Sequence, residues 1–435
     1  MTQVRSELAS SSYQKAYATY QKKVADTQRV DELLNLGLLA FEAGDYETSF
    51  RVLAEAERLA EERETKSLSR EAAGIAISDR VRAYQGTVFD KAMLHYYRGL
   101  GFLAQNSLES ATVEGRRIAT YLEVNARESK HAYKDDAFLQ YFSGSLYDAF
   151  GQFNDAWISY KRAREMYADF YGVPEPSFLC PVTLAAVRKV GHEESEKELE
   201  ERCGGDAPNR EWGRVIVICE AGLSPPILEE NIMFPIYKSD PKRWDKDEDR
   251  DEYAWRVSER RYHQDDNVTV DYFLRVALPY YSSEYVGTSV QNVVVRDTAG
   301  GEFPCELTTR LAAILRQDLS DRMPAIVARA ISRALIKYAA TKAAEQVGGK
   351  KDKWLGDVLG AAVNIAGAAS EAADTRSWET LPDRIFVADF RLPPGPHTLR
   401  AVLRDDFGTV LFRHDFDPVE VKRGQVTFLR ARCMR

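Results

Sequence analysis

Residues 135–170 read DDAFLQYFSGSLYDAFGQFNDAWISYKRAREMYADF, and this stretch determines how the first half of the chain is interpreted. Gly144 lies within an apolar, helix-forming run, and Gly151 follows where a turn would end that helix. Ala156 and Ala163 then keep one face of the returning helix free of bulky side chains. The pattern predicts a hairpin of two closely packed helices, because small side chains let helix backbones approach one another.

The same spacing recurs in two earlier stretches, residues 33–62 and 93–122. Asn106 stands in the second stretch where the other two have the turn glycine. Such a hairpin cannot bury its apolar face alone, so repeated hairpins stack into an array. The offsets are those of tetratricopeptide repeats (TPR), and they predict a TPR-like α-solenoid over residues 1–205. The residues expected in helix contacts or turns are Gly37, Gly44, Ala56, Gly99, Ala111, Gly144, Gly151, Ala156 and Ala163.

The composition argues against several classes of protein. The chain has 435 residues, of which 44% are hydrophobic and 29% charged, as in ordinary globular proteins. A net charge of −8 disfavours nucleic acid as a partner, because neutralising phosphates requires a concentrated basic face. No run reaches the roughly 20 apolar residues of a membrane-spanning helix. Residues 1–17 are polar and lack the apolar core of a signal peptide.

The period of the sequence changes after about residue 206. Residues 215–222 (VIVICEAG) and 385–392 (IFVADFRL) are rich in β-branched and aromatic side chains, which is typical of strands. Helix-forming sequence intervenes at about 302–374, and strands then resume to the C-terminus. We therefore expect an α+β multidomain protein, in which the solenoid precedes a β-sandwich-like domain over residues 206–435 with a helical insertion.

Helix-forming residues 305–319 open the insertion, and two longer helix-forming stretches, residues 324–346 and 353–374, follow. The second stretch offers a small-residue face on which another helix could pack closely. In one interpretation the two stretches form a hairpin buried on the β domain; in the other they project and dock on a membrane surface or an identical subunit. The apolar stripe of the first stretch consists of Ile326, Ala330, Ile331, Ala334 and Leu335.

Five cysteines are widely spread, with no Cys-x-x-Cys pair and no histidine at metal-ligand spacing. Either all five are free, or Cys180 and Cys203 form a disulfide that closes a short helical loop. A disulfide would indicate an oxidising compartment.

No stretch carries a recognisable catalytic, cofactor or metal motif. Residues 347–351 (VGGKK) lack the first glycine and the Ser or Thr of a phosphate-binding loop. The acidic run 245–251 lacks the turn glycine and the bidentate glutamate of a calcium loop. The sequence has no nucleophile elbow, and its histidines are scattered. We therefore expect a non-enzyme without cofactor or metal.

Residues 78–118 (SDRVRAYQGTVFDKAMLHYYRGLGFLAQNSLESATVEGRRI) resemble the signature of a little-characterised family of bacterial TPR-containing envelope lipoproteins. RSWETLP at 376–382 and LPPGPHTLR at 392–400 fit the same family. The resemblance implies a lipid anchor outside this chain, membrane association through that anchor, and other envelope proteins or lipoproteins as partners. The residues that carry the match are Asp79, Tyr84, Gly86, His95, Tyr96, Glu114, Arg116 and Arg117.

Together these features predict a non-catalytic protein–protein interaction scaffold of the bacterial cell envelope, which binds partner segments in the groove on the inner, concave face of its repeat array. Partner contacts are expected from Tyr84, His95, Tyr96, Glu114, Arg116 and Arg117. Alternatively, His95 is a hydrogen-bonded side chain between helices, and the charges at 114–117 form an internal salt-bridge network.

The alternative function is a cell-wall-acting enzyme, or its regulator, with a site between the two domains. The expected location is the periplasm, on an outer-membrane lipid anchor, and the cytoplasm is the alternative. Self-association is a further option for the partner.

Overall fold

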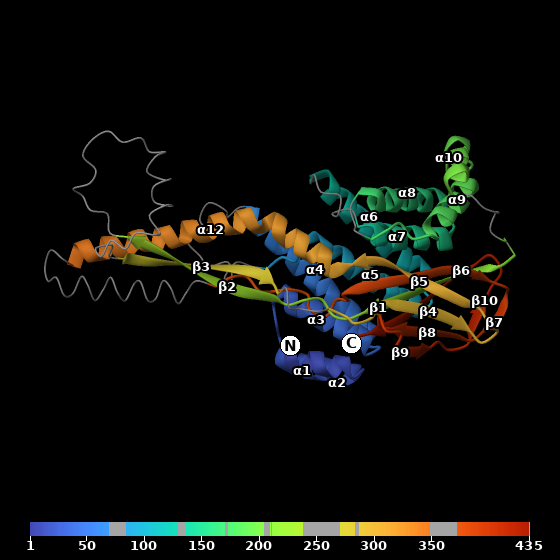
Figure 1. Ribbon diagram of the computed structural model, residues 1–435, viewed down its shortest axis with the longest axis horizontal. Coiled ribbons are helices and arrows are strands. Elements are labelled where there is room, and N and C mark those ends of the chain that lie inside the picture. The colour runs from blue at the N-terminus through green and yellow to red at the C-terminus, as the bar shows by residue number, and fades with distance from the viewer. Residues whose placement is uncertain are drawn as a thin grey trace.

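The computed structural model describes residues 1–68, 84–128, 136–169, 173–203, 209, 211–237, 270–282, 287–348 and 372–434. An array of TPR-like helical hairpins precedes a curled β-sheet domain, and a long arm extends from the body (Figure 1). The expected α+β multidomain fold is confirmed. None of the helices in the described ranges is long and apolar enough to cross a bilayer.

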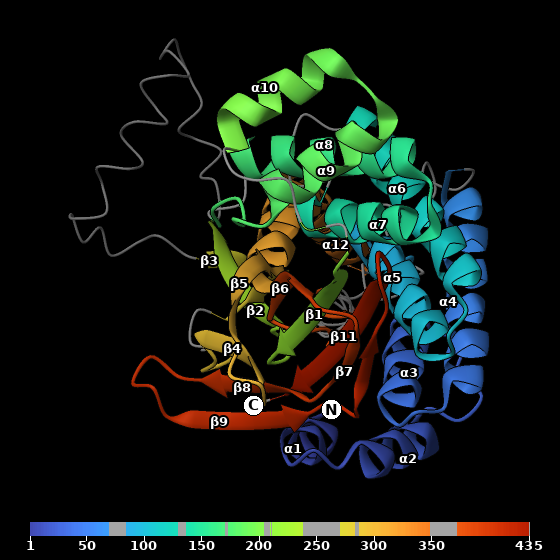
Figure 2. The same ribbon diagram turned by 90° about the vertical axis from the view of Figure 1, so that its right-hand side faces the viewer.

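Helix pairs of the array follow one another along the chain and stack side by side (Figure 2). The first pair packs against the start of the array and against Leu223 and Met434. The helices are α1 (Thr2–Ala9), α2 (Tyr13–Lys23), α3 (Val30–Glu42), α4 (Tyr46–Leu68), α5 (Val88–Ala104), α6 (Leu108–Glu128), α7 (Ala137–Phe150), α8 (Phe153–Asp169), α9 (Leu179–Val190) and α10 (Glu193–Cys203).

The turns inside the hairpins have the geometry that the spacing predicts. Gly44, Asn106 and Gly151 lie between the two helices of successive hairpins, with φ values of 83°, 57° and 85°. This left-handed conformation favours glycine and tolerates asparagine. Asn106 therefore performs the turn that glycine performs in the other two hairpins.

Small residues lie where the helices of a hairpin approach each other. A Cβ added to Gly144 would lie 2.8 Å from the Tyr160 ring, and one added to Gly37 would lie 2.6 Å from Leu53. Gly99 packs against Phe142 of the next repeat, where an added Cβ would lie 3.3 Å from the ring. Ala56, Ala111, Ala156 and Ala163 are at most 1% exposed.

The β domain contains one curled seven-stranded sheet with the order β11-β1-β6-β5-β4-β8-β9 (Figure 2). Strands β1 and β11 are parallel, and every other pair in the sheet is antiparallel. The strands of this sheet are β1 (Gly213–Ala221), β4 (Asn292–Asp297), β5 (Glu302–Arg310), β6 (Arg384–Leu392), β8 (Leu399–Arg404), β9 (Val410–Asp415) and β11 (Val426–Cys433). The short strands β7 (Gly395–His397) and β10 (Val419–Val421) pair separately.

Strand β1 is buried on both faces, so its two sets of alternating side chains belong to different cores. Val215 and Val217 pack inside the curl of the sheet. Ile216 and Ile218 point the other way and join the apolar core of the helical array. The sheet therefore lies directly against the helices, because residues alternate between its faces.

The arm combines strands β2 (Ile227–Tyr237) and β3 (Val270–Tyr281) with helix α12 (Leu311–Gly348). The two strands form an antiparallel ribbon, and Ala330 and Ala334 of α12 pack against Leu274 and Val276 of β3. Small residues on the helix allow this close packing.

Three expectations for the insertion are corrected by this arrangement. Residues 302–310, expected at its start, form strand β5, and the helix begins at Leu311. Pro324 does not begin a new helix; it lies inside α12. Ile331 and Leu335, expected in the apolar stripe, are 37% and 49% exposed. Most of the proposed partner stretch, 353–374, lies outside the described residues.

The structure contradicts the interpretation that all five cysteines are free. Cys180 of α9 and Cys203 of α10 form a disulfide with a Cα–Cα distance of 5.5 Å. Cys219, Cys305 and Cys433 are not part of this disulfide and are buried in the β domain. The disulfide thus ties together the last two helices of the array.

Candidate functional site

The inner face of the helical array is occupied by the protein's own sheet (Figure 2). The Tyr96 hydroxyl donates to Glu220 Oε1 of β1 at 2.7 Å. The Tyr141 hydroxyl donates to Asp389 Oδ2 of β6 at 2.7 Å. Helices α5 and α7 therefore hold the sheet through tyrosines as well as through apolar contacts.

One buried ionic cluster surrounds Glu220, which is 0% exposed. Arg430 Nη2 lies 2.5 Å from Glu220 Oε2 and 2.5 Å from Glu42 Oε1 on α3. Arg432 Nη1 lies 3.3 Å from Glu220 Oε2. Burial alone would raise the pKa of Glu220, but Arg430 and Arg432 outweigh it and lower that pKa. The carboxylate is therefore ionised and fully engaged.

A second cluster surrounds Arg214, whose side chain is 4% exposed. Arg214 Nη2 donates to Asp389 Oδ2 at 2.6 Å, and Nη1 donates to Asp148 Oδ2 at 2.8 Å. Nη1 also donates to the Tyr160 hydroxyl at 2.9 Å. Charges from both halves of the protein are thus paired inside their contact surface.

These contacts contradict the expectation that a partner binds in the inner groove of the array. Tyr96, predicted as a partner contact, is 0% exposed and bonded to Glu220. Tyr84, also predicted, donates to Asp90 Oδ2 at 3.0 Å at the start of α5. In the described part of the array, the inner face is therefore not available to a partner segment.

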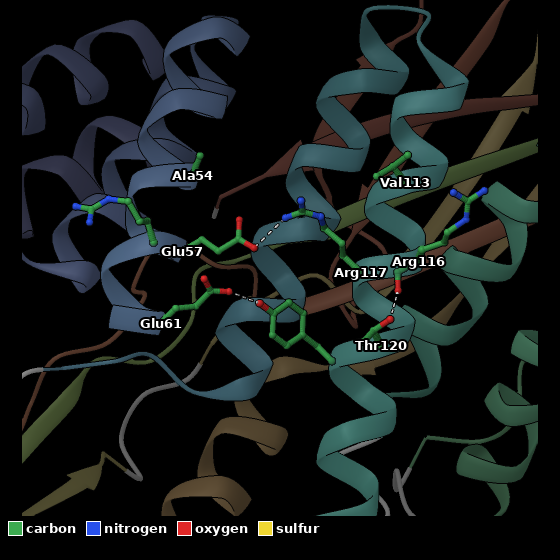
Figure 3. A pocket seen from close by; sticks show the side chains of 9 residues that line it. Ala54, Glu57, Glu61, Val113, Arg116, Arg117 and Thr120 are labelled. Carbon is green, nitrogen blue, oxygen red and sulfur yellow. Dashed lines mark hydrogen bonds and ion pairs between the residues drawn. The ribbon is translucent and has the colours of Figure 1, made fainter. Parts of the chain in front are cut away.

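An open groove lies instead on the outer side, between α4 and α6 (Figure 3). Its volume is about 710 Å³. Arg116 and Arg117, both predicted as partner contacts, come from α6: the Arg117 side chain points toward α4, whereas the Arg116 guanidinium points away from α4 at the rim of the groove (Figure 3). The residues that line it are Ala54, Glu57, Arg58, Glu61, Val113, Arg116, Arg117, Thr120 and Tyr121.

A polar stripe along α4 explains why the helices stand apart here. Glu57, Glu61 and Glu64 follow Phe50 and Ala54 at intervals of three or four residues, which places all five on one helix face. Helix α4 consequently contacts α5 less extensively than α6 contacts α7. Long charged side chains, rather than small apolar ones, bridge the first and second hairpins.

The partners of this stripe come from α5 and α6. Glu57 lies 3.1 Å from Arg98 and 3.0 Å from Arg117. The Tyr121 hydroxyl donates to Glu61 at 3.2 Å. Lys91 pairs with Glu64 at 2.6 Å. The acidic stripe of α4 therefore faces basic and aromatic side chains of α5 and α6.

His95 lies beneath the groove and is 0% exposed. Its Nδ1 is 2.6 Å from Glu114 Oε2, and its Nε2 is 3.3 Å from Glu57 Oε1. Burial alone would lower the pKa of His95, but the hydrogen bonds and charges of Glu114 and Glu57 outweigh it and raise that pKa. His95 and Glu114 are thus internal supports of the groove and do not reach a partner directly, as the alternative interpretation of both residues holds.

Among the exposed residues that line the groove, Val113 and Arg116 are available to contact another molecule. Val113 is 41% exposed. Arg116 is exposed, and its guanidinium has no ion pair with any residue in the described ranges. Arg117, in contrast, is paired with Glu57 across the groove. An apolar contact next to an unmatched cation is suited to recognition of a partly apolar, acidic segment.

The Glu57 carboxylate is poorly suited to acid catalysis. Burial alone would raise the pKa of Glu57, but His95, Arg117 and Arg98 outweigh it, and the pKa is lowered. A general acid needs a raised pKa instead.

Sequence reasoning missed four of the groove residues, Glu57, Glu61, Val113 and Tyr121. The available signal was the repeated acidic residues on α4, where a repeat helix normally has apolar residues.

No family model and no curated protein matches the sequence. Solved structures resemble part of it. MamA from AMB-1 is 15% identical, with 46% of this chain and 94% of that chain covered and a TM-score of 0.28. A putative kinesin light chain of Podosopora anserina with TPR-like repeats is 14% identical, with 46% and 90% covered and a TM-score of 0.32. BtubC from P. vanneervenii is 17% identical, with 47% and 79% covered and a TM-score of 0.28. Likeness at this level says nothing about function.

Proposed function

We propose that the protein is a non-catalytic interaction scaffold of the bacterial cell envelope, and that it docks protein segments in the outer groove between α4 and α6. The observation that carries this proposal is the combination of exposed Val113 with Arg116, which has no ion partner in the described ranges, in an open groove. The inner face of the array is already filled by the sheet, so docking takes place on the outer face.

Two observations support an envelope location. The Cys180–Cys203 disulfide is typical of proteins from oxidising compartments. The resemblance of residues 78–118 to envelope lipoproteins implies a lipid anchor supplied outside this chain. Mass spectrometry of the protein from its native host tests the location: a lipid-modified cysteine ahead of this chain supports it, and an unmodified cytosolic protein overturns it.

Site-specific photocrosslinking in the native host tests the groove. A photoreactive residue at Val113 is expected to give a discrete crosslinked product that disappears in the Arg116→Glu variant. Ile158 on α8 is a matched control, because it is 45% exposed on another helix of the array and does not line the groove.

The outcomes of this experiment are clear-cut. A product that forms from Val113, not from Ile158, and depends on Arg116 supports the proposal. Equal products from both positions, or a Val113 product that Arg116→Glu leaves unchanged, overturns the groove as the docking site.

A further inference from the structure

The turn between β8 and β9 presents an aromatic side chain to solvent. Phe407 is 94% exposed, far more than any other large hydrophobic residue in the described ranges. It lies within the sequence Asp405-Asp406-Phe407-Gly408. An isolated exposed apolar residue is ordinary on a protein surface, but one this exposed on a rigid turn is suited to anchoring a contact.

Hydrogen bonds fix this turn. Asp405 Oδ1 accepts from the backbone N–H groups of Phe407 at 2.9 Å and of Thr409 at 2.8 Å. The Gly408 N–H donates to the Asp405 carbonyl at 3.1 Å, and Gly408 has a φ of 81°. Arg404 Nη1 donates to the Gly408 carbonyl at 2.8 Å. Because the turn is already ordered, inserting Phe407 into a partner loses little conformational entropy.

The charge beside Phe407 is negative and available. Asp405 uses its carboxylate within the turn, whereas Asp406 is exposed and its carboxylate has no partner among the described residues. The turn therefore offers a phenyl ring and a carboxylate side by side. A complementary surface needs an apolar recess with a cation at its edge.

The α4–α6 groove of the same protein has these two features. Ala54 and Val113 supply apolar surface, and Arg116, whose guanidinium points away from α4 at the α6 rim (Figure 3), supplies a cation without an ion partner in the described part of the chain. We propose that the groove receives the β8–β9 turn of a second copy of this chain, with Phe407 on Val113 and Asp406 paired with Arg116. This inference rests on the groove being the docking site of the proposed function.

The positions of the two surfaces determine what kind of assembly forms. The loop end of the β8–β9 hairpin and helix α4 lie on opposite sides of the molecule (Figure 2). A copy that inserts its turn into a neighbour therefore leaves its own groove open for another copy. Such a head-to-tail contact produces a ring if it closes and a filament if it does not.

The contact area around a single turn is small, so the association is expected to be weak and dependent on concentration and salt. A lipid anchor would raise the local concentration by confining copies to one membrane surface. Soluble protein must therefore be measured over a wide concentration range.

Sedimentation equilibrium of the purified chain tests the proposal. Wild type is expected to self-associate, and Phe407→Ser is expected to weaken the association about tenfold or more. Phe150→Ser is the matched control, because Phe150 is 41% exposed at the end of α7 and lies outside both surfaces; its association should equal that of wild type. Thermal melts confirm that each variant is folded.

A charge exchange makes the test specific for the pair. Arg116→Asp and Asp406→Arg are each expected to lose association alone, because each creates a like-charge contact. An equimolar mixture of the two variants is expected to regain it, since every junction between unlike copies again joins opposite charges. Recovery in the mixture supports the proposal.

Three results would overturn it: monomeric wild type at every concentration, unchanged association in folded Phe407→Ser, or a mixture that stays monomeric. The crosslinking experiment tests the proposed function separately from the self-association. If photocrosslinking from Val113 still captures an Arg116-dependent product of another protein while wild type stays monomeric, the groove docks a different partner and only the self-association is wrong.

Discussion

Replacing Arg214 with methionine tests whether the sheet is held in the inner face of the helical array by charge. The substitution keeps a long unbranched side chain but removes the guanidinium that joins Asp389 of the sheet to Asp148 of α7. It therefore removes one charge from the contact surface and leaves the apolar packing nearly unchanged.

The expected loss in the free energy of unfolding depends on which partners Asp148 and Asp389 keep when the Arg214 guanidinium is removed. Asp148 keeps Lys189 at 2.5 Å, so most of its charge remains compensated. Asp389, whose side chain is 3% exposed, keeps the Tyr141 hydroxyl at 2.7 Å and an electrostatic interaction with Arg391, but no described ion pair. Breaking a buried pair from one side costs about 3–5 kcal/mol, because the remaining charge is left buried. We expect Arg214→Met to lower the free energy of unfolding by that amount in urea denaturation.

Arg400→Met is the matched control, since the Arg400–Asp415 pair is 52% and 61% exposed on the edge of the same sheet. Exposed pairs contribute little to stability, and the denaturation midpoint should not move. Equal midpoints for Arg214→Met and wild type would refute the reasoning, because an uncompensated buried carboxylate cannot be free of cost.

Three further outcomes are expected. Ala156→Leu places a large side chain at a fully buried helix contact and should cost about 1–3 kcal/mol; an unchanged thermal melt would show that the repeat register is wrong. His95→Gln should lose stability relative to wild type at about pH 6 and lose less at about pH 9. The raised pKa of folded His95 makes its contribution complete below the ordinary value of 6.5 and lost as pH rises through the raised value; a difference independent of pH would contradict this assignment. Cys180→Ser should cost about 2–5 kcal/mol, and thiol titration of the unreduced, unfolded wild type should find only the three other cysteines.

Local rules were sufficient to predict the helical hairpins from the sequence. Gly151 and Asn106 mark turns because their backbone conformation disfavours most other residues, and this requirement is visible in the chain itself. Gly144 likewise marks a close helix approach, and Ala156 a fully buried helix contact. The strands were also visible, since β1 contains the continuous apolar run 215–219 and β6 combines β-branched and aromatic residues with alternating polar ones. These features depend on neighbours within a few residues.

The arrangement of the two halves could not be predicted in the same way. Tyr96 and Glu220 are 124 residues apart in sequence, and neither residue type indicates by itself that it is a buried partner. A tyrosine-rich helix looks the same whether it lines a binding groove or holds an internal sheet. Helix α12 was similarly misjudged at Pro324, because the packing of its second half on the β2–β3 ribbon compensates for the backbone hydrogen bond that proline removes.

The buried clusters bear on the predicted division into residues 1–205 and 206–435, which stays a prediction. Separating the halves would expose Ile216 and Ile218 and would leave Arg430 without Glu42, one of its two carboxylate partners. A charge network shared between two segments stabilises each only while both are present, so neither segment should retain the stability it has in the full chain. For this reason the recognition surface must be sought on the outer helices: the inner face, which an isolated repeat array would offer to a partner, is here part of the protein's own folded core.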